Sequence, residues 1–242
     1  MAWQWQAGAG TSSSNTSGSI TSTVSVNATA GFSVVTYAGN STTGATVGHS
    51  LGVAPKMIII KNRSAATVGA QGQNWIVYNS NLSGSLTASS TTFTLPATAN
   101  VLQLNLTLAV NSYGMDAQVN GTGYNYVAYC FSEVAGYSKA FSYTGNGSAD
   151  GPFVYCGFRP RFVMVKRTDS TSDWLMYDTS RNTYNEANLY LGANVSTAES
   201  TGVPFDILSN GFKCRNTIFN VSSGTYIFMA FAENPFKNSL AR

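Results

Sequence analysis

The chain has 242 residues and a net charge of +3, from 13 Lys and Arg against 10 Asp and Glu. Only 10% of its residues are charged, against roughly 25% in ordinary globular proteins, and 43% are hydrophobic. So weak a charge, with no basic stripe among the aromatic residues, argues against a nucleic-acid-binding protein. No apolar run reaches membrane-spanning length and no secretory signal precedes the chain, so membrane insertion is not expected.

The N-terminal segment, residues 1–30, differs in composition from everything that follows. It reads MAWQWQAGAG and then TSSSNTSGSITSTVSVNATA, which predicts a linker or an extended arm. The alternation in Ile20–Val26 allows this arm to add one edge strand. Trp3 and Trp5 need a partner for their large apolar surface, which is either another subunit or the chain's own domain.

From residue 31 onward, four sequence blocks recur in the same order about 100 residues later. GFSVVTYAGN recurs as GYSKAFSYTGN, PKMIIIKN as PRFVMVKR, NWIVY as DWLMY, and YVAYCFSE as YIFMAFAE. The landmark pairs are Pro55 and Pro160, Trp75 and Trp174, and Glu133 and Glu233. This repetition predicts two copies of one module, at residues 31–135 and 136–242.

Each copy is predicted to be a series of strands. In the first copy these are Phe32–Tyr37, Thr46–His49, the apolar run after Pro55, Trp75–Tyr78 and the alternating Leu102–Val110. In the second they are Lys139–Tyr143, Phe153–Gly157, the run after Pro160 and Trp174–Tyr177, and both copies close on a strand ending in Phe-x-Glu. A short helix is considered at Thr183–Leu191, and a type I′ turn is expected at Asn210–Gly211.

The expected fold class is therefore all-β. It consists of two tandem antiparallel β-sandwich repeats, jelly-roll-like, behind an extended N-terminal arm. The repeated landmarks are interpreted as scaffold. For Trp75 and Trp174, core packing is favoured over stacking on sugar rings, because both are flanked by apolar residues.

Catalytic chemistry has little support in the sequence. His49 is the only histidine and lies in a predicted turn, VGHSLG, without a nucleophile motif. Cys130, Cys156 and Cys214 lie in apolar runs, and their odd number does not suit a disulfide framework, so buried free thiols are expected. The segment Asp169–Asp173 lacks the dense ligand ladder of a calcium loop. No enzyme, metal site or cofactor is expected, although two of the ten carboxylates could still meet across a groove.

The blocks quoted above, with FSYTGNGSADGPFVYCGFRPRFVMVKRTD, DWLMYDTSRN and YIFMAFAENPF, resemble a module of tail-fibre-like and other virion surface proteins of marine and cyanobacterial tailed phages. The resemblance covers about residues 31–237 and brings no catalytic residues with it. In many relatives the module looks like the C-terminal part of a longer protein. Here it follows a short arm, which favours a compact spike, a short fibre or a decoration subunit over a long shaft.

This resemblance implies a structural protein of the virion, assembled in the host cytoplasm, where cysteines stay reduced. We expect a short tail fibre or spike that is attached to other virion proteins through Trp3 and Trp5. Its host-recognition loops would carry Tyr113, Tyr184 and Tyr190, which lie in the segments that the two copies do not share, and would contact a surface glycan or protein. The alternatives are a capsid decoration or head-fibre protein and, more remotely, a polysaccharide-degrading enzyme. Edge strands favour a homo-oligomer, and analogy with fibres favours a trimer.

Overall fold

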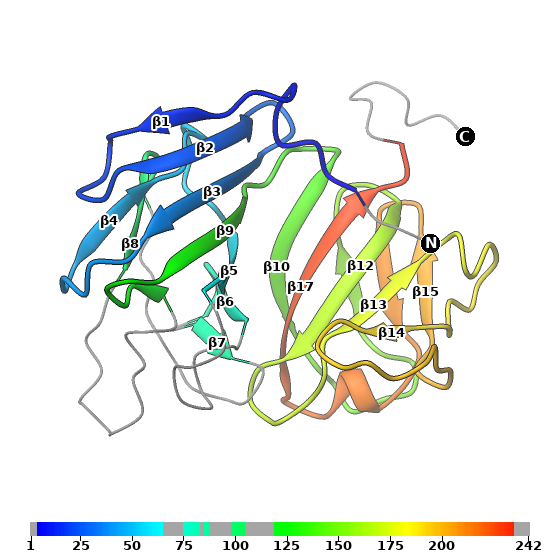
Figure 1. The fold of residues 1–242 in the computed structure, drawn as a ribbon. Helices are drawn as coiled ribbons and strands as arrows, with labels where there is room; N and C mark the ends of the chain where they lie inside the picture. Colours follow the sequence, from blue (N-terminus) through cyan, green and yellow to red (C-terminus); the bar gives the residue numbers. More distant parts are fainter. Residues whose placement is uncertain (1–3, 65–74, 83–84, 88–97, 105–118, 235–242) are drawn as a thin grey trace. The chain divides into compact units, whose positions relative to one another are not determined.

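The computed structural model describes residues 4–64, 75–82, 85–87, 98–104 and 119–234 (Figure 1). It shows the expected all-β class, with every pair of neighbouring strands antiparallel in the described sheets. The chain forms two compact units, Met1–Ser132 and Glu133–Arg242. Each unit contains two sheets around its own hydrophobic core, as in a β-sandwich.

The first unit has a seven-stranded and a two-stranded sheet. The larger sheet has the order β1 (Ser13–Asn15), β2 (Ser22–Asn27), β3 (Phe32–Ala38), β9 (Asn125–Phe131), β5 (Met57–Asn62), β6 (Ile76–Asn79) and β7 (Ser85–Thr87). The smaller sheet pairs β4 (Ala45–Gly48) with β8 (Val101–Leu104). Alternate residues of both sheets, including Val35, Val47, Ile58, Ile60 and Leu102, meet in one buried cluster.

The second unit has a five-stranded and a three-stranded sheet. The larger has the order β10 (Ser138–Thr144), β17 (Thr225–Ala232), β12 (Pro160–Arg167), β13 (Leu175–Asp178) and β14 (Leu191–Gly192). The smaller has the order β11 (Phe153–Tyr155), β16 (Gly211–Cys214) and β15 (Phe205–Leu208), and the 3-10 turn η1 (Ile218–Asn220) precedes β17. The core between them is rich in aromatic residues, among them Tyr177, Phe205, Phe212 and Phe228.

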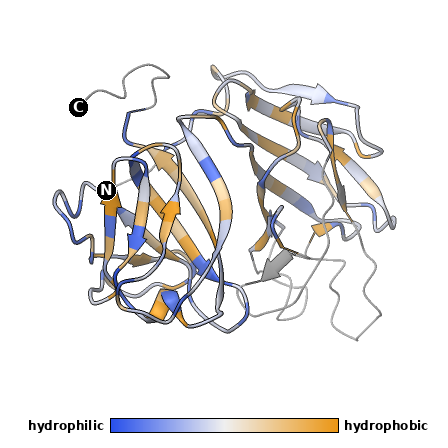
Figure 2. Ribbon diagram, turned by 180° about the vertical axis from the view of Figure 1, so that it is seen from behind, coloured by the Kyte–Doolittle hydropathy of each residue, from blue (hydrophilic) through white to orange (hydrophobic). Residues whose placement is uncertain are grey.

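The most apolar strands of the sequence lie at the centre of each sheet (Figure 2). Strand β17 is buried over seven of its eight residues, from Tyr226 to Ala232, and β12 begins at Pro160, next to an irregularity in its register. A proline at the first residue of a strand costs little, because its missing N–H is needed least there. The continuous apolar runs therefore form the strands that are covered on both faces.

The segment assigned to an arm is largely part of the first unit. Strands β1 and β2 extend the seven-stranded sheet beyond β3, with Ser22 opposite Tyr37 and Val24 opposite Val35. The alternation that the sequence showed from Ile20 onward places Ile20 and Val24 in the core. Residues 13–27 therefore fold as strands and not as a free linker, because their alternate apolar side chains gain burial by joining the sheet.

The two units share a strand order and a register at their centres. The first has β3, β9, β5 and β6 side by side, and the second has β10, β17, β12 and β13 in the same succession. Tyr37 lies opposite Tyr126 and stacks on it with ring centroids 5.2 Å apart. Tyr143 lies opposite Tyr226 in the same way, at 4.8 Å. The recurring sequence blocks thus occupy corresponding strands.

A buried asparagine closes the end of each unit with one hydrogen-bond pattern. In the first unit, Asn120 Nδ2 donates to Asn40 Oδ1 at 3.2 Å and to the Thr42 carbonyl at 3.1 Å, while its Oδ1 accepts from the Asn40 N–H at 3.0 Å. In the second, Asn220 makes the corresponding three bonds to Asn146 and Ser148. Both asparagines are fully buried, so their amides replace water for loop groups that have left the ladder.

Two local expectations were wrong. Residues 183–191 form no helix; Asn182 and Asn185 instead bind the backbone of the segment and of Ile207. The turn expected at Asn210–Gly211 lies one residue earlier, because Leu208 pairs with Gly211 and Gly211 opens strand β16. A Cβ atom added at Gly211 would lie 2.1 Å from the Val154 carbonyl oxygen. Glycine is therefore required here for close packing and not for the turn.

The buried asparagines give the first prediction. Replacing either one, by Asn120→Ala or Asn220→Ala, is expected to lower the free energy of unfolding by about 2–4 kcal/mol, because the hydrogen bonds by which a fully buried amide holds a loop are lost. Chemical denaturation measures the loss. Asn100→Ala, at an exposed asparagine, serves as the control and should change stability by less than about 0.5 kcal/mol. Equal stability of all three variants would show that the amides contribute nothing.

Candidate functional site

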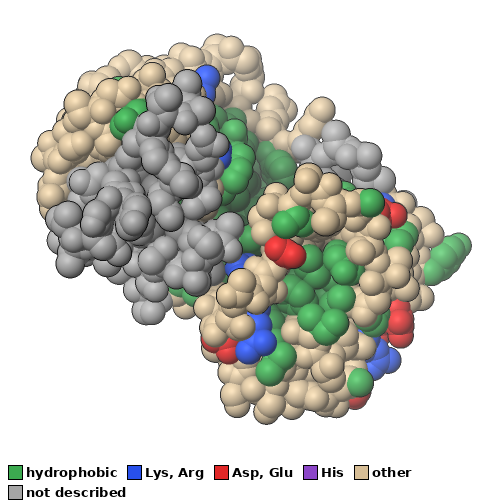
Figure 3. Space-filling view, turned by 60° about the horizontal axis from the view of Figure 1, so that its bottom comes forward, with side chains coloured by type: hydrophobic (Ala, Val, Ile, Leu, Met, Phe, Trp, Pro, Cys, Tyr) green, Lys and Arg blue, Asp and Glu red, His purple; other side chains and the backbone are tan. Residues whose placement is uncertain are grey.

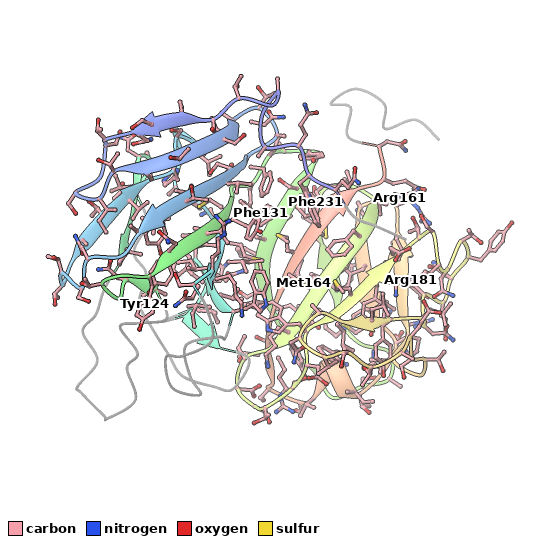
Figure 4. All side chains as sticks on the ribbon, in the orientation of Figure 1. Tyr124, Phe131, Arg161, Met164, Arg181 and Phe231 are labelled. Carbon is pink, nitrogen blue, oxygen red and sulfur yellow. The ribbon has the colours of Figure 1, made fainter. Side chains whose placement is uncertain are left out.

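The variable segment of the second unit, residues 179–204, connects β13 to β15 and contains β14. Arg181 fixes its start: its Nε lies 2.5 Å from Asp178 Oδ2, its Nη2 donates to the Met176 carbonyl at 3.1 Å, and its Nη1 lies 3.5 Å from Glu199 Oε2. Arg181 and Asp178 are almost fully buried, and Figure 4 labels Arg181 beside β13. A buried pair of this kind sets the position of a loop, because either charge alone would be costly to bury.

Two asparagine side chains then hold the backbone of the segment. Asn182 Oδ1 accepts hydrogen bonds from the N–H groups of Asn188, at 3.1 Å, and Leu189, at 2.8 Å. Asn185 Nδ2 donates to the Ile207 carbonyl at 3.1 Å, and its Oδ1 accepts from the Ile207 N–H at 2.9 Å. Asn185 thus bonds to both the N–H and the carbonyl of Ile207, as the backbone of a neighbouring strand would. This attaches the loop to β15.

Tyr184 lies between these two anchors and is 85% exposed, more than any other large hydrophobic residue described. A protein that exposes a tyrosine so fully, on backbone held from both sides, presents a ring and a hydroxyl to a partner. Little ordering entropy remains to be lost on binding, because the loop is already fixed. Tyr184 is the predicted contact residue whose placement agrees best with that role.

The other predicted contact residues are placed differently. Tyr190 is half-buried, packs on Tyr177 with ring centroids 5.9 Å apart and belongs to the rim of the core. Its backbone exchanges hydrogen bonds with Ser200, so it supports the segment and presents little surface. Tyr113 and Trp3 lie outside the described residues. Trp5 is half-buried, with its ring edge-on to Phe131 at 6.0 Å, so this part of the arm lies on its own unit.

The two landmark tryptophans differ in burial. Trp174 is 6% exposed, as expected for a core residue, and the backbone of Ala193 and the side chain of Asn194 bind its main chain. Trp75 is 45% exposed, and the expectation of core packing was wrong for it. Lys61 Nζ lies 5.4 Å from the centre of its ring and Tyr129 lies at 6.3 Å.

Further apolar side chains on the surface of the second unit escaped the sequence reasoning. Phe153 is 45% exposed and Tyr155 is 60% exposed, although both lie in a correctly predicted strand, β11. Figure 3 shows hydrophobic side chains gathered on the visible face of this unit, bordered by charged ones. Alternation alone did not reveal them, since it cannot tell which face of a strand is covered.

Several of the described carboxylates are engaged as structural partners. Asp169 pairs with Arg167 at 2.7 Å and Glu233 with Arg159 at 2.8 Å, while Glu133 accepts the Ala140 N–H at 3.1 Å. These roles agree with the expectation that Glu133 and Glu233 are scaffold residues. Asp173, the other end of the calcium-loop candidate, accepts from Asn194 at 2.8 Å. Among the described residues, no group of three or more His, Cys, Asp and Glu is arranged to hold a metal ion.

His49 is completely buried in the turn that the sequence predicted. Its Nε2 lies 3.1 Å from the Thr98 carbonyl, and its Nδ1 accepts the Leu51 N–H at 3.2 Å. These contacts require the neutral ring with its proton on Nε2. Burial lowers the pKa of His49 below its ordinary value of 6.5, against the opposing effect of the Thr98 carbonyl. This histidine organises a turn.

Comparisons with known proteins place the whole described chain in one domain family. The family model described as "Domain of unknown function (DUF7483)" matches residues 1–235. Neither the comparison with curated proteins nor that with solved structures gave a match. No helix among the described residues has the length and apolar character needed to cross a membrane.

The buried histidine makes stability depend on pH. Because its pKa is lower in the folded than in the unfolded chain, the unfolded chain gains protons first as the pH falls below about 6.5. The midpoint of thermal unfolding should therefore decrease from pH 7 to pH 5. His49→Gln keeps one donor and one acceptor and should remove most of this decrease. Identical pH profiles for both proteins would contradict the assignment.

The three cysteines are expected to be unreactive in the folded protein. Each is buried, and burial raises the pKa of Cys130, Cys156 and Cys214 to about 12. A thiol reagent attacks the thiolate, so modification at pH 7.5 should be at least about a hundredfold slower than after unfolding in guanidinium. Mass spectrometry of the labelled protein measures this. Rapid labelling of any of the three without unfolding would show that it is accessible.

Proposed function

The chain belongs to the DUF7483 family, and we propose that it is a structural protein of a tailed-phage virion that recognises the host surface through the variable segment of its second unit. Within the virion, its place is a short tail fibre or spike. The alternative place, as a capsid decoration or head-fibre protein, differs in location and copy number but uses the same fold. The proposal describes a binding protein, and no catalytic step is part of it.

The resemblance of the repeated blocks to phage surface proteins is the main support for the virion setting. The composition agrees with it, because a particle surface needs a durable fold and not a charged active site. With 10% charged residues, the chain uses its carboxylates as partners of Arg181, Arg159 and Arg167. Buried free cysteines suit assembly in a reducing host cytoplasm.

The exposure of Tyr184 is the single observation that carries the recognition role. Tyrosine gives a large contact area at a low cost in conformational entropy, and recognition loops use it for that reason. The loop is held to the rest of the unit by Arg181, Asn182 and Asn185. These anchors leave the tyrosine free to contact a partner. The chemistry of the exposed ring and hydroxyl suits a glycan or a protein surface.

Attachment through the N-terminal residues remains part of the proposal in a narrower form. Trp5 already contacts Phe131, and residues 13–27 are strands of the first unit. An attachment by this end would therefore use residues 1–12 and a surface beside β1. Deleting residues 1–10 tests it directly: virions should lose the protein, and full incorporation of the shortened chain would reject the attachment.

Host binding gives the fourth prediction. Tyr184→Ala should weaken binding of the purified chain to cells of the phage's host at least about tenfold, because a central aromatic contact is lost. Flow cytometry with the labelled protein measures it. Ile218→Ala, which truncates another exposed apolar residue of the same unit, is the matched control and should bind normally.

Two outcomes would reject parts of this proposal. Equal binding by both variants and the unchanged chain would exclude Tyr184 from recognition. A cryo-electron microscopy map of the virion locates the protein: density at the capsid would replace the tail-fibre placement with the decoration alternative, and no density would reject the virion setting. Degradation of host capsule by the purified chain would reject the non-enzymatic function.

A further inference from the structure

The outer face of the three-stranded sheet in the second unit carries an arrangement that the Tyr184 loop does not explain. Along β11, Val154 points into the core, whereas its neighbours Phe153 and Tyr155 are exposed on the other face. Strand β11 is at the edge of its sheet. Lys213 of β16 lies directly opposite Phe153 on the same outer face, and Gly211 lies opposite Tyr155.

Glycines let both rings lie close to the backbone. A Cβ on Gly211 would meet two ring atoms of Phe153 at 3.0 Å, and one on Gly157 would lie 3.5–3.8 Å from the ring and hydroxyl of Tyr155. Gly157 also has a φ of +83°, which favours glycine. The rings therefore pack against bare backbone on one side and face solvent on the other. We call Phe153 and Tyr155 the aromatic platform.

A chain of ionic groups borders the platform. Asp150 accepts from Lys213 Nζ at 2.7 Å and from Arg215, and Arg215 Nε also lies 2.9 Å from Asp206 Oδ2. The hydrogen bond from Lys213 is the main cause that lowers the pKa of Asp150, which keeps the carboxylate ionised. Two cations and two carboxylates thus form a bordering strip with no net charge. It offers N–H donors and carboxylate acceptors side by side.

We propose that this face is a binding site for a neutral saccharide, which stacks its ring faces on Phe153 and Tyr155 and hydrogen-bonds its hydroxyl groups to the strip of Asp150, Lys213, Arg215 and Asp206. Alternate residues of a strand are about 7 Å apart, so the two exposed rings lie on one face of the edge strand at a spacing that suits a sugar ring. A sugar complements this surface in two ways. Its C–H groups pack on the aromatic faces, and its hydroxyl groups both donate and accept hydrogen bonds along the strip.

The charges favour a neutral ligand over other occupants. An anionic polymer or a phosphate needs cations that have no carboxylate partner, and here Lys213 and Arg215 are both paired. An acidic membrane surface would be repelled by Asp150, whose side chain is 68% exposed. A neutral polyol can share the bonds of the existing pairs without separating them, so little electrostatic energy is lost on binding.

The site is separate from Tyr184 and does not rest on the virion setting. Purified chain would bind the saccharide wherever the protein acts, so its failure leaves the Tyr184 proposal intact, and the reverse also holds. If the chain is a host-recognition protein, the platform adds a second contact for the sugar chains of a cell surface. Two weak sites on one molecule then reinforce each other through effective concentration.

Titration of the purified full chain with defined oligosaccharides tests the inference. The probes are maltohexaose, cellohexaose and chitohexaose, with a sulfated heparin hexasaccharide for comparison, and heteronuclear NMR or calorimetry follows binding. At least one neutral probe is expected to bind with a Kd of about 0.1–1 mM, as suits an open surface. Phe153→Ala and Tyr155→Ala should each weaken that binding about tenfold or more.

Ile218→Ala is the matched control, since it removes an exposed apolar residue elsewhere in the unit and should bind like the unchanged chain. Asp206→Asn tests the strip separately and should weaken binding of the neutral probe without removing it.

Three outcomes would overturn the inference: no neutral probe binds, the sulfated probe binds more tightly, or binding survives both platform variants. Binding lost in Trp75→Ala instead would move the sugar contact to the first unit. Self-association through the β11 edge, abolished by the platform variants, would replace the saccharide with a second copy.

Discussion

Removing a buried polar group from water demands a partner, and this constraint shapes one end of each unit. In each unit the chain leaves the central strand pair at a loop whose backbone has lost its ladder bonds. Asn120 and Asn220 supply those bonds from fully buried positions, and the stacked pairs Tyr37 with Tyr126 and Tyr143 with Tyr226 pack beside them. These bonds hold the loops that follow β3 and β10 against the segments that precede β9 and β17.

The same chemistry recurs where the units differ. In the segment between β13 and β15, the side chains of Asn182 and Asn185 hydrogen-bond to the backbone and hold a long loop, as Asn220 holds a short one. A sequence poor in charge and rich in asparagine can therefore fix irregular backbone without helices or disulfides. Fixed loops on a rigid sandwich agree with the proposed recognition role, since they present an exposed residue such as Tyr184 in one conformation.

Several of the few ionic residues in the chain are paired with one another. Asp178 holds Arg181 at the base of the variable segment, and Asp150, Lys213, Arg215 and Asp206 form the strip beside the aromatic platform. A paired strip presents donors and acceptors without a net field. This is why we propose a neutral polar ligand for this surface of the second unit.

The positions of most central strands along the chain could be predicted from the sequence, because apolar alternation and the recurring blocks depend only on local spacing; the order of the strands within the sheets could not. The buried thiols and the structural His49 also followed from their apolar or turn context. What only the tertiary structure decided is which side chains stay exposed: Trp174 is 6% exposed, whereas Trp75, at the matching place in the first copy, is 45% exposed and Tyr155 is 60% exposed. Gly211 looked like a turn residue, yet it makes room for Phe153 of a strand distant in sequence. Exposure and close approach depend on neighbours brought together by folding, and no single segment of the chain encodes them.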